Sequence, residues 1–165
     1  MNVTLKLARN EEAQTLAALH TAVARDLTAK FGNGHWSGKT TPRGVLFNMR
    51  NSTVYVARRG EVVIATLTLA TKKPWAIDRK YFTRCKRPLY LTHMAVSPEL
   101  QRQGIGRACV ESAVEIVRKF PGDAIFLDAY DADAGAGEFY RKCGFREVGR
   151  AAYRGVPLIY FELLV

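Results

Sequence analysis

The sequence predicts a mixed α/β fold with one sheet of about seven strands, mostly antiparallel, and helices on both faces. An apolar strand, an amphipathic helix and a second apolar strand follow one another over 89–130. This succession is typical of a parallel pair joined by a right-handed crossover. Hairpin patterns at 53–70 and 146–164 lie on either side of it, and strands joined by a hairpin turn pair antiparallel. We therefore expect a mixed sheet.

The N-terminal part of the chain predicts a strand, a helix and a loop. Alternating apolar residues at 3–7 indicate the strand. Asn10 can cap the helix that follows, whose apolar residues recur at helical spacing through Leu27. The stretch 31–50 is rich in glycine and predicts mainly loop, with a short second helix near 45–50.

The rest of the chain is mostly strand. The connection at 71–88 is basic and long for a link between paired strands, which is typical of a binding loop. An almost continuously apolar run at 124–130 predicts a central strand buried on both faces. The other expected elements are strands at 53–57, 62–70, 89–96, 146–153 and 158–164, a helix at 104–120 and a short helix at 134–143.

Length and composition indicate one soluble domain that spans residues 1–165, because no linker or repeat divides the chain. No apolar run is long enough to cross a bilayer, and no signal-peptide pattern is present, so we expect a cytoplasmic protein that does not enter membranes. Cys85, Cys109 and Cys143 lack metal-ligand spacing and are expected to be reduced thiols. The net charge of +10 favours anionic partners, such as a phosphorylated cofactor, an acidic substrate or nucleic acid.

The most informative segment is a glycine turn between the strand at 89–96 and the helix that follows. We call these residues the glycine turn: Gln101, Arg102, Gln103, Gly104, Ile105, Gly106 and Arg107. Two glycines let the backbone approach a ligand closely, and the amides, the dipole of the following helix and two arginines favour a phosphate or pyrophosphate. The turn is neither a P-loop nor a complete dinucleotide fingerprint, and taken alone it also fits an ordinary tight turn.

Together with its neighbours, the turn gives the chain a resemblance to the GNAT superfamily of acyl-CoA-dependent N-acetyltransferases over nearly its whole length. The turn fits the signature Gln/Arg-x-x-Gly-x-Gly/Ala, and the segment from Met94 to Pro98 fits the strand end before it. The segment from Phe139 to Phe145 fits the family pattern Phe/Leu-Tyr-x-x-x-Gly-Phe. The resemblance implies a sheet splayed between its fourth and fifth strands, with the pantetheine arm of acetyl-CoA (coenzyme A) in the gap.

The resemblance also implies a set of cofactor contacts. Backbone groups of Met94 and Val96 would pair with the pantetheine amides like an added strand, and amides of the glycine turn would hold the pyrophosphate. Position 133 usually carries Asn in the family, whereas an ionised Asp133 accepts but cannot donate a hydrogen bond. The implied cofactor-binding residues are Met94, Ala95, Val96, Gln101, Arg102, Gln103, Gly104, Ile105, Gly106, Arg107, Asp133 and Tyr140.

The implied reaction is transfer of an acetyl group from acetyl-CoA to a primary amine of a small molecule or peptide, by direct attack in a ternary complex. Tyr140 is the candidate general acid for the leaving thiolate, and its structural alternative is an aromatic ring that packs one helix face. The amide of Met94 would polarise the thioester carbonyl.

The general base is left open. Strand alternation puts Tyr90 on the face of Met94 and His93 on the opposite face. His93 has a suitable intrinsic pKa, and a water chain to Asp128 or Asp131 is an alternative, as is the absence of any dedicated base.

The sequence indicates only general features of the amine acceptor. Trp75, Tyr81 and Phe82 of the basic connection could line its pocket, and an acceptor with a carboxylate or phosphate beside its amine fits the charges best. A non-catalytic acyl-CoA-binding domain and a nucleic-acid-associated basic protein are the alternatives, although the chain has no recognised nucleic-acid motif. The final hairpin could support a homodimer.

Overall fold

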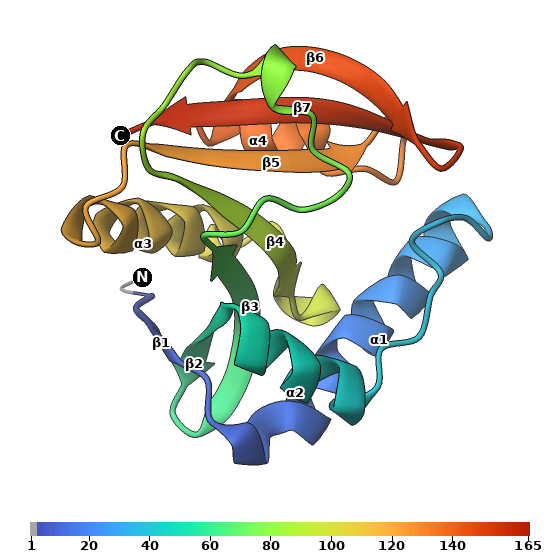
Figure 1. The fold of residues 1–165 in the computed structure, drawn as a ribbon. Coiled ribbons are helices and arrows are strands. Elements are labelled where there is room, and N and C mark those ends of the chain that lie inside the picture. The colour runs from blue at the N-terminus through green and yellow to red at the C-terminus, as the bar shows by residue number, and fades with distance from the viewer. Residues whose placement is uncertain (1–2) are drawn as a thin grey trace. The chain divides into compact units, whose positions relative to one another are not determined.

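The computed structural model describes residues 3–165, which form seven strands and four α-helices (Figure 1). The strands are β1 (Leu5–Leu7), β2 (Thr53–Arg59), β3 (Val62–Ala70), β4 (Pro88–Val96), β5 (Ala124–Tyr130), β6 (Arg146–Tyr153) and β7 (Val156–Leu164). The helices are α1 (Ala13–Phe31), α2 (Pro42–Asn51), α3 (Ile105–Lys119) and α4 (Gly137–Lys142). Short 3-10 turns occur at Asn10–Glu12, Arg79–Tyr81 and Pro98–Leu100.

The strand order is β1-β2-β3-β4-β5-β7-β6. The β4–β5 pair is parallel, whereas β1–β2, β2–β3, β5–β7 and β6–β7 are antiparallel. The predicted fold class is thus confirmed. The crossover from β4 to β5 runs through α3, as the strand-helix-strand pattern predicts.

The chain divides into two compact units. The first contains residues 3–69 with His93–Ala113, and the second contains Ala70–Thr92 with Val114–Val165. Strand β4 therefore contributes its first half to the second unit and its last residues to the first. The expectation of a single domain over 1–165 stays a prediction.

In the first unit, α1 and α2 are anchored on β2 through a small apolar core. Its members are Ala13, Leu16, Ala17, Val45, Val54 and Val56. Full burial of one such valine or leucine contributes about 1.5–3 kcal/mol. Helix α2 begins at Pro42, earlier than predicted, because Thr41 accepts a hydrogen bond from the Gly44 amide (3.1 Å) and proline suits a first helical position.

The prediction that Asn10 caps α1 is wrong. Residues Asn10–Glu12 form a separate 3-10 turn, and α1 begins at Ala13. The amide of Arg9 donates to the Glu12 carboxylate (2.7 Å), which also pairs with the Arg58 guanidinium of β2. Tertiary pairing of Glu12 therefore sets this end of the helix.

The second unit is built around β5, whose residues from Ala124 to Leu127 are at most 1% exposed, as the apolar run predicts. The connection between β3 and β4, residues 71–87, is here called the basic loop. It crosses one face of β5 and β7, and α4 lies on the other face (Figure 1).

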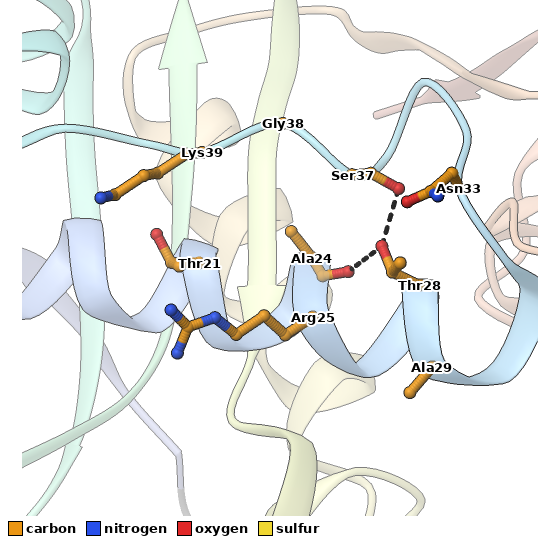
Figure 2. A pocket seen from close by; sticks show the side chains of 9 residues that line it. All are labelled: Thr21, Ala24, Arg25, Thr28, Ala29, Asn33, Ser37, Gly38 and Lys39. Atoms are coloured by element: carbon orange, nitrogen blue, oxygen red, sulfur yellow. Dashed lines mark hydrogen bonds between the residues drawn. The ribbon is translucent and has the colours of Figure 1, made fainter.

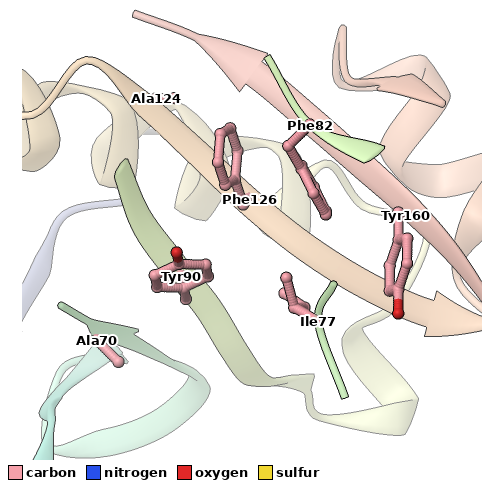
Figure 3. Close-up of a cluster of buried hydrophobic side chains, with 7 residues drawn as sticks. All are labelled: Ala70, Ile77, Phe82, Tyr90, Ala124, Phe126 and Tyr160. Carbon is pink, nitrogen blue, oxygen red and sulfur yellow. The ribbon is translucent and has the colours of Figure 1, made fainter. Parts of the chain in front are cut away.

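The basic loop is held by an aromatic core (Figure 3). Phe82 stacks against Phe126 of β5 with 4.4 Å between ring centroids, and Tyr81 lies 5.4 Å from the ring of Tyr160. The buried members of this cluster are Ala70, Ile77, Phe82, Tyr90, Ala124, Phe126 and Tyr160.

The observed ends of α4 and β7 differ from the predicted ones. Helix α4 is confined to Gly137–Lys142, three residues later than predicted, because residues 131–136 form turns. A Cβ on Gly135 would lie 2.0 Å from the Tyr130 carbonyl oxygen, so only glycine fits there. Strand β7 begins at Val156, two residues early, because Arg154 and Gly155 complete the hairpin turn with positive φ angles of 50° and 80°.

Candidate functional site

The glycine turn leads directly into α3, as predicted. The Ala108 amide donates to the Gly104 carbonyl (3.0 Å), and the amides of Ile105 and Gly106 precede this first helical bond. Gly104 has a φ of +81°, and a Cβ placed on it would meet nothing within 4 Å. The left-handed backbone therefore favours glycine at this position, and the space beside the Gly104 Cα is open.

Hydrogen bonds fasten the turn to the neighbouring strands. The side-chain amide nitrogen of Gln101 donates to the Val96 carbonyl of β4 (3.2 Å), and the Ser97 backbone amide donates to the Ile64 carbonyl of β3 (2.9 Å). Ile105 is 1% exposed, so its burial anchors the turn, whereas Arg102 and Arg107 are exposed at its rim. The result is a cradle of amides and cations that suits a phosphate or pyrophosphate.

Strand β4 is irregular immediately before this cradle. His93 has a φ of 49°, a left-handed conformation in which alternation of side chains breaks down. The alternation argument that places Tyr90 and Met94 on one face, opposite His93, is therefore not valid in this strand. Tyr90 belongs instead to the aromatic core of the second unit, where its hydroxyl accepts a hydrogen bond from Arg79 (3.0 Å). The Met94 side chain is half-buried, and Ala95 is buried.

The parallel register of β4 and β5 joins three residues of each strand, from Pro88 with Ala124 to Tyr90 with Phe126. Beyond this point β4 continues to Val96 and β5 to Tyr130.

Two histidines meet in the first unit. The rings of His20 on α1 and His93 on β4 make a T-shaped contact with 6.3 Å between centroids. Burial, and then the neighbouring imidazole, lower the pKa of His20 to about 4, and desolvation lowers the pKa of His93. Both rings are therefore neutral near pH 7, and a neutral His93 can accept a proton. The sequence does not reveal this pair, because the two residues are 73 positions apart.

Tyr140 lies in α4 of the second unit and is 7% exposed. Its ring packs against Phe145 and Phe161, with centroid distances of 5.4 and 6.1 Å. Burial, followed by the charge of Asp128, raises the pKa of Tyr140. Its hydroxyl is therefore protonated at neutral pH, as a general acid requires.

The three aspartates singled out in the sequence have different environments. Asp128 of β5 is partly buried, and desolvation raises its pKa. Asp131 pairs with Arg150 of β6 (3.3 Å), whereas Asp133 is exposed in the turn before α4. Asp128 is thus the better placed proton acceptor of the two proposed for a water chain.

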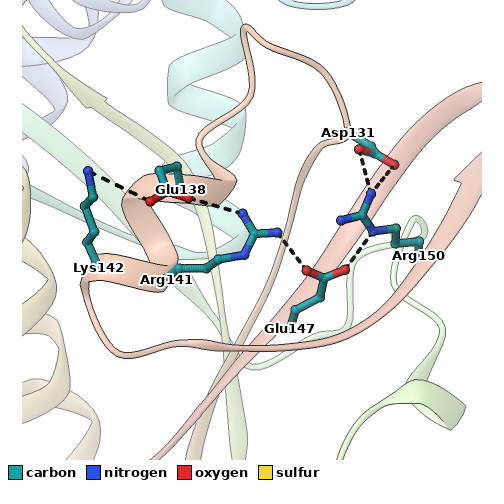
Figure 4. Close-up of polar contacts among 6 residues, drawn as sticks. All are labelled: Asp131, Glu138, Arg141, Lys142, Glu147 and Arg150. Atoms are coloured by element: carbon teal, nitrogen blue, oxygen red, sulfur yellow. Dashed lines mark hydrogen bonds and ion pairs between the residues drawn. The ribbon is translucent and has the colours of Figure 1, made fainter.

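Sequence reasoning missed the ion-pair network around this turn (Figure 4). Arg150 joins Asp131 to Glu147 (2.7 Å), and Glu147 also binds Arg141 of α4 (2.7 Å). The network ties the residues after β5 and the helix that carries Tyr140 to strand β6. No local pattern signals it, because its members become neighbours only through the sheet.

Of the three aromatic residues expected at an acceptor pocket, two line a cavity. Trp75, which is 81% exposed, and Tyr81 line a cavity of about 670 Å³ in the second unit. Phe82 does not contribute, because it is buried against Phe126.

A second cavity, of about 400 Å³, lies in the first unit between α1 and the loop after it (Figure 2). The Thr28 hydroxyl donates to the Ala24 carbonyl and contacts the Ser37 hydroxyl, both at 2.7 Å. Arg25 and Lys39 give the cavity a positive charge. Its hydroxyls come from residues that the sequence analysis assigned to helix and loop without a role.

Within residues 3–165, no group of three or more His, Cys, Asp or Glu side chains is arranged to hold a metal ion. Across the same described part of the chain, every helix is too short or too polar to cross a membrane. Cys85, Cys109 and Cys143 are free thiols.

Comparison with known proteins decides the family. The model of the acetyltransferase (GNAT) family matches residues 19–145, which include β4, the glycine turn and α4. The chain belongs to the GNAT acetyltransferase family. The expected enzyme class, an acyltransferase, is confirmed with it.

Solved structures share the fold of this GNAT protein at low sequence identity. The PaiA N-acetyltransferase from Thermoplasma acidophilum, in complex with coenzyme A, has a TM-score of 0.74 and 15% identity, with all of both chains covered. An acetyltransferase from Bacillus subtilis in complex with CoA has a TM-score of 0.62 and 17% identity, with 99% of each chain covered. The ribosomal-protein-S18-alanine N-acetyltransferase from Escherichia coli has a TM-score of 0.68 and 17% identity, covering 98% of this chain and 93% of its own. No curated protein sequence matches the chain.

Proposed function

We propose that this GNAT protein transfers an acetyl group from acetyl-CoA to a primary amine of a small molecule or peptide in the cytoplasm. The observation that carries the proposal is the open glycine turn at the start of α3, with its left-handed Gly104 and exposed Arg102 and Arg107. Family membership and the coenzyme A complexes of structural neighbours support pyrophosphate as its ligand.

The proposed cofactor site extends from the turn in both directions. Amides from Gln101 to Arg107 hold the pyrophosphate, backbone groups of Met94, Ala95 and Val96 pair with the pantetheine arm, and Asp133 adds a contact. Bound acetyl-CoA supplies an activated thioester. The Met94 amide would donate a hydrogen bond to the thioester carbonyl and stabilise the negative charge that develops on that oxygen.

The protonation states of Tyr140, His93 and Asp128 determine how protons move in the proposed reaction. The Tyr140 hydroxyl gives its proton to the leaving sulfur, and burial keeps that hydroxyl protonated beforehand. The amine must lose a proton to attack, and either neutral His93 or partly buried Asp128, through water, takes it. The new bond joins the amine nitrogen to the acetyl carbon, and the carbon–sulfur bond breaks.

The test is release of the free thiol of coenzyme A from acetyl-CoA in the presence of a panel of amines and amino-terminal peptides. Turnover with at least one amine and none without acceptor is expected. Tight coenzyme A binding with no turnover on any amine would favour a non-catalytic acyl-CoA-binding protein instead. Polyamines as the best acceptors by kcat/KM would contradict an acceptor that carries an anionic group.

A further inference from the structure

The cavity of about 670 Å³ in the second unit is an open one, lined by residues of the basic loop and of the β6–β7 hairpin. Its walls include Lys73, Trp75, Arg79, Tyr81, Tyr153 and Tyr160. All of these residues belong to one compact unit, so the cavity depends only on contacts within it.

Arg79 carries an unpaired positive charge in this cavity wall. Among residues 3–165 it has no carboxylate within ion-pair distance, and its Nε atom is buried without an acceptor. A guanidinium out of bulk water normally pairs with an acid, because desolvation of an unpaired charge is costly. The missing acid suggests that an anion from outside the chain completes the pair.

The side chain of Arg79 is held in place in advance. Its Nη1 donates to the Tyr90 hydroxyl (3.0 Å), its Nη2 donates to the Cys85 carbonyl (3.4 Å), and its Cζ lies 5.2 Å from the centre of the Phe126 ring. A fixed guanidinium loses little entropy when it binds an anion, and its planar shape suits carboxylate and phosphate oxygens.

The other charges around the cavity reinforce this preference. Lys73 donates to the carbonyls of Pro74 (3.1 Å) and Ile77 (2.7 Å), so its charge is hydrogen-bonded but not neutralised. Asp78 pairs with Lys80 (3.2 Å). The cavity walls therefore hold three cationic side chains and a single acidic one.

Aromatic side chains give the cavity a second property. Trp75 exposes 81% of its surface, and the rings of Tyr81 and Tyr153 also line the space. Such exposed flat rings bind planar apolar groups by stacking.

We propose that this cavity binds a small organic anion in which a planar apolar group carries a carboxylate or phosphate, with Arg79 pairing the anion and Trp75 covering the flat group. On the proposed function, this anion is part of the amine acceptor. Tyr160 lines the cavity and lies directly opposite Asp128 in the β5–β7 register, so a carboxylate for the acceptor's amine lies beside the cavity wall.

The experiment measures binding to the full chain by calorimetry, without acetyl-CoA. The probes are phenylacetate, phenyl phosphate and neutral phenylacetamide. The variants are Arg79→Gln and Trp75→Ala. Arg84→Gln is the control, because it removes the same charge from an exposed loop position outside the cavity. The wild type should bind the better of the two anions about ten-fold more tightly than the amide, and which anion binds better identifies the group.

Arg79→Gln should abolish that preference, whereas Arg84→Gln should keep it. Trp75→Ala should weaken binding of all three probes by roughly five-fold without changing their order, and because Trp75 is mostly exposed the variant should fold. If Arg79→Gln does not fold, Arg79→Lys, which keeps the charge and loses the fork, should reduce the preference.

An unchanged preference in Arg79→Gln, an equal loss in Arg84→Gln, or no binding of any probe to the wild type would overturn this inference. Acetylation of amines without any anion preference would overturn it and leave the proposed function intact. Anion binding through Arg79 in a chain that never turns over acetyl-CoA would contradict only the proposed function.

Discussion

The glycine turn and the basic loop both present positive charge to an expected anion, but they do so by different means. In the glycine turn the donors are backbone amides, and the conformation of one glycine places them. In the basic loop the donor is the side chain of Arg79, and aromatic packing from β4 and β5 places it. A site made of backbone amides can be predicted from a short sequence pattern. A site made of a side chain cannot, because its position depends on neighbours from distant segments.

The largest expected effect concerns the side chain proposed for proton transfer. Tyr140→Phe keeps the ring packing and removes the hydroxyl, so kcat should fall by about 100-fold or more with little change in coenzyme A affinity. Steady-state kinetics and calorimetric titration with coenzyme A measure the two quantities. An unchanged kcat would remove Tyr140 from the mechanism and leave the Met94 amide and the proposed base, His93 or Asp128, as the remaining catalytic groups.

The next effect tests whether tertiary contacts hold the basic loop. Glu162 of β7 is 2% exposed and accepts hydrogen bonds from the Thr83 amide (2.8 Å) and hydroxyl (2.7 Å) of the loop, and from Arg146. Glu162→Ala leaves these donors unpaired and should lower the free energy of unfolding by about 3 kcal/mol.

Denaturant unfolding measures that loss. Glu138→Ala is the matched control, since its carboxylate pairs with Arg141 and Lys142 at the surface, and it should cost less than about 0.5 kcal/mol. Equal small losses in both variants would mean that the loop does not depend on the buried carboxylate.

Two glycines with the same conformation separate backbone strain from ligand binding. Gly104 in the glycine turn and Gly155 in the β6–β7 hairpin have φ angles of +81° and +80°, and at each an added Cβ meets nothing within 4 Å. Alanine at either position should cost about 1–2 kcal/mol of stability. Gly104→Ala should also weaken coenzyme A binding, whereas Gly155→Ala should not. An equal effect of both on coenzyme A affinity would exclude the glycine turn as the pyrophosphate site.

The last expected effect is a pH dependence of stability in the first unit, which is absent at neutral pH and grows only as the pH falls. The pKa of His20 is about 4 in the folded chain and near 6.5 when unfolded, so the unfolded chain binds more protons between these values. Its contribution to stability is present above pH 6.5 and is lost as pH falls toward 4. His20→Asn should flatten the stability profile in that window, as chemical denaturation at several pH values would measure. A parallel profile for the wild type and the variant would contradict the low pKa.

The sequence predicts most strands well where apolar residues are dense. Both ends of β3 and β5 agree with the structure, because continuous β-branched and apolar runs mark buried strands. The errors in the sequence-based prediction occur where a contact with a residue distant in the chain overrides the local conformational preference. Glu12 starts α1 through Arg58 rather than Asn10 acting as a cap, and the positive φ of His93 disrupts the alternation assumed for β4.

By itself, the sequence determined the fold class, the glycine turn and the motifs of the GNAT family. Each of these depends on the spacing of residues close together in the chain. The tertiary structure alone decided which side chains meet. It paired His20 with His93, placed Phe82 in the core and left Arg79 without an acid in a cavity wall. These contacts join residues far apart in the chain, and burial and charge at such meeting points depend on packing that no local pattern records.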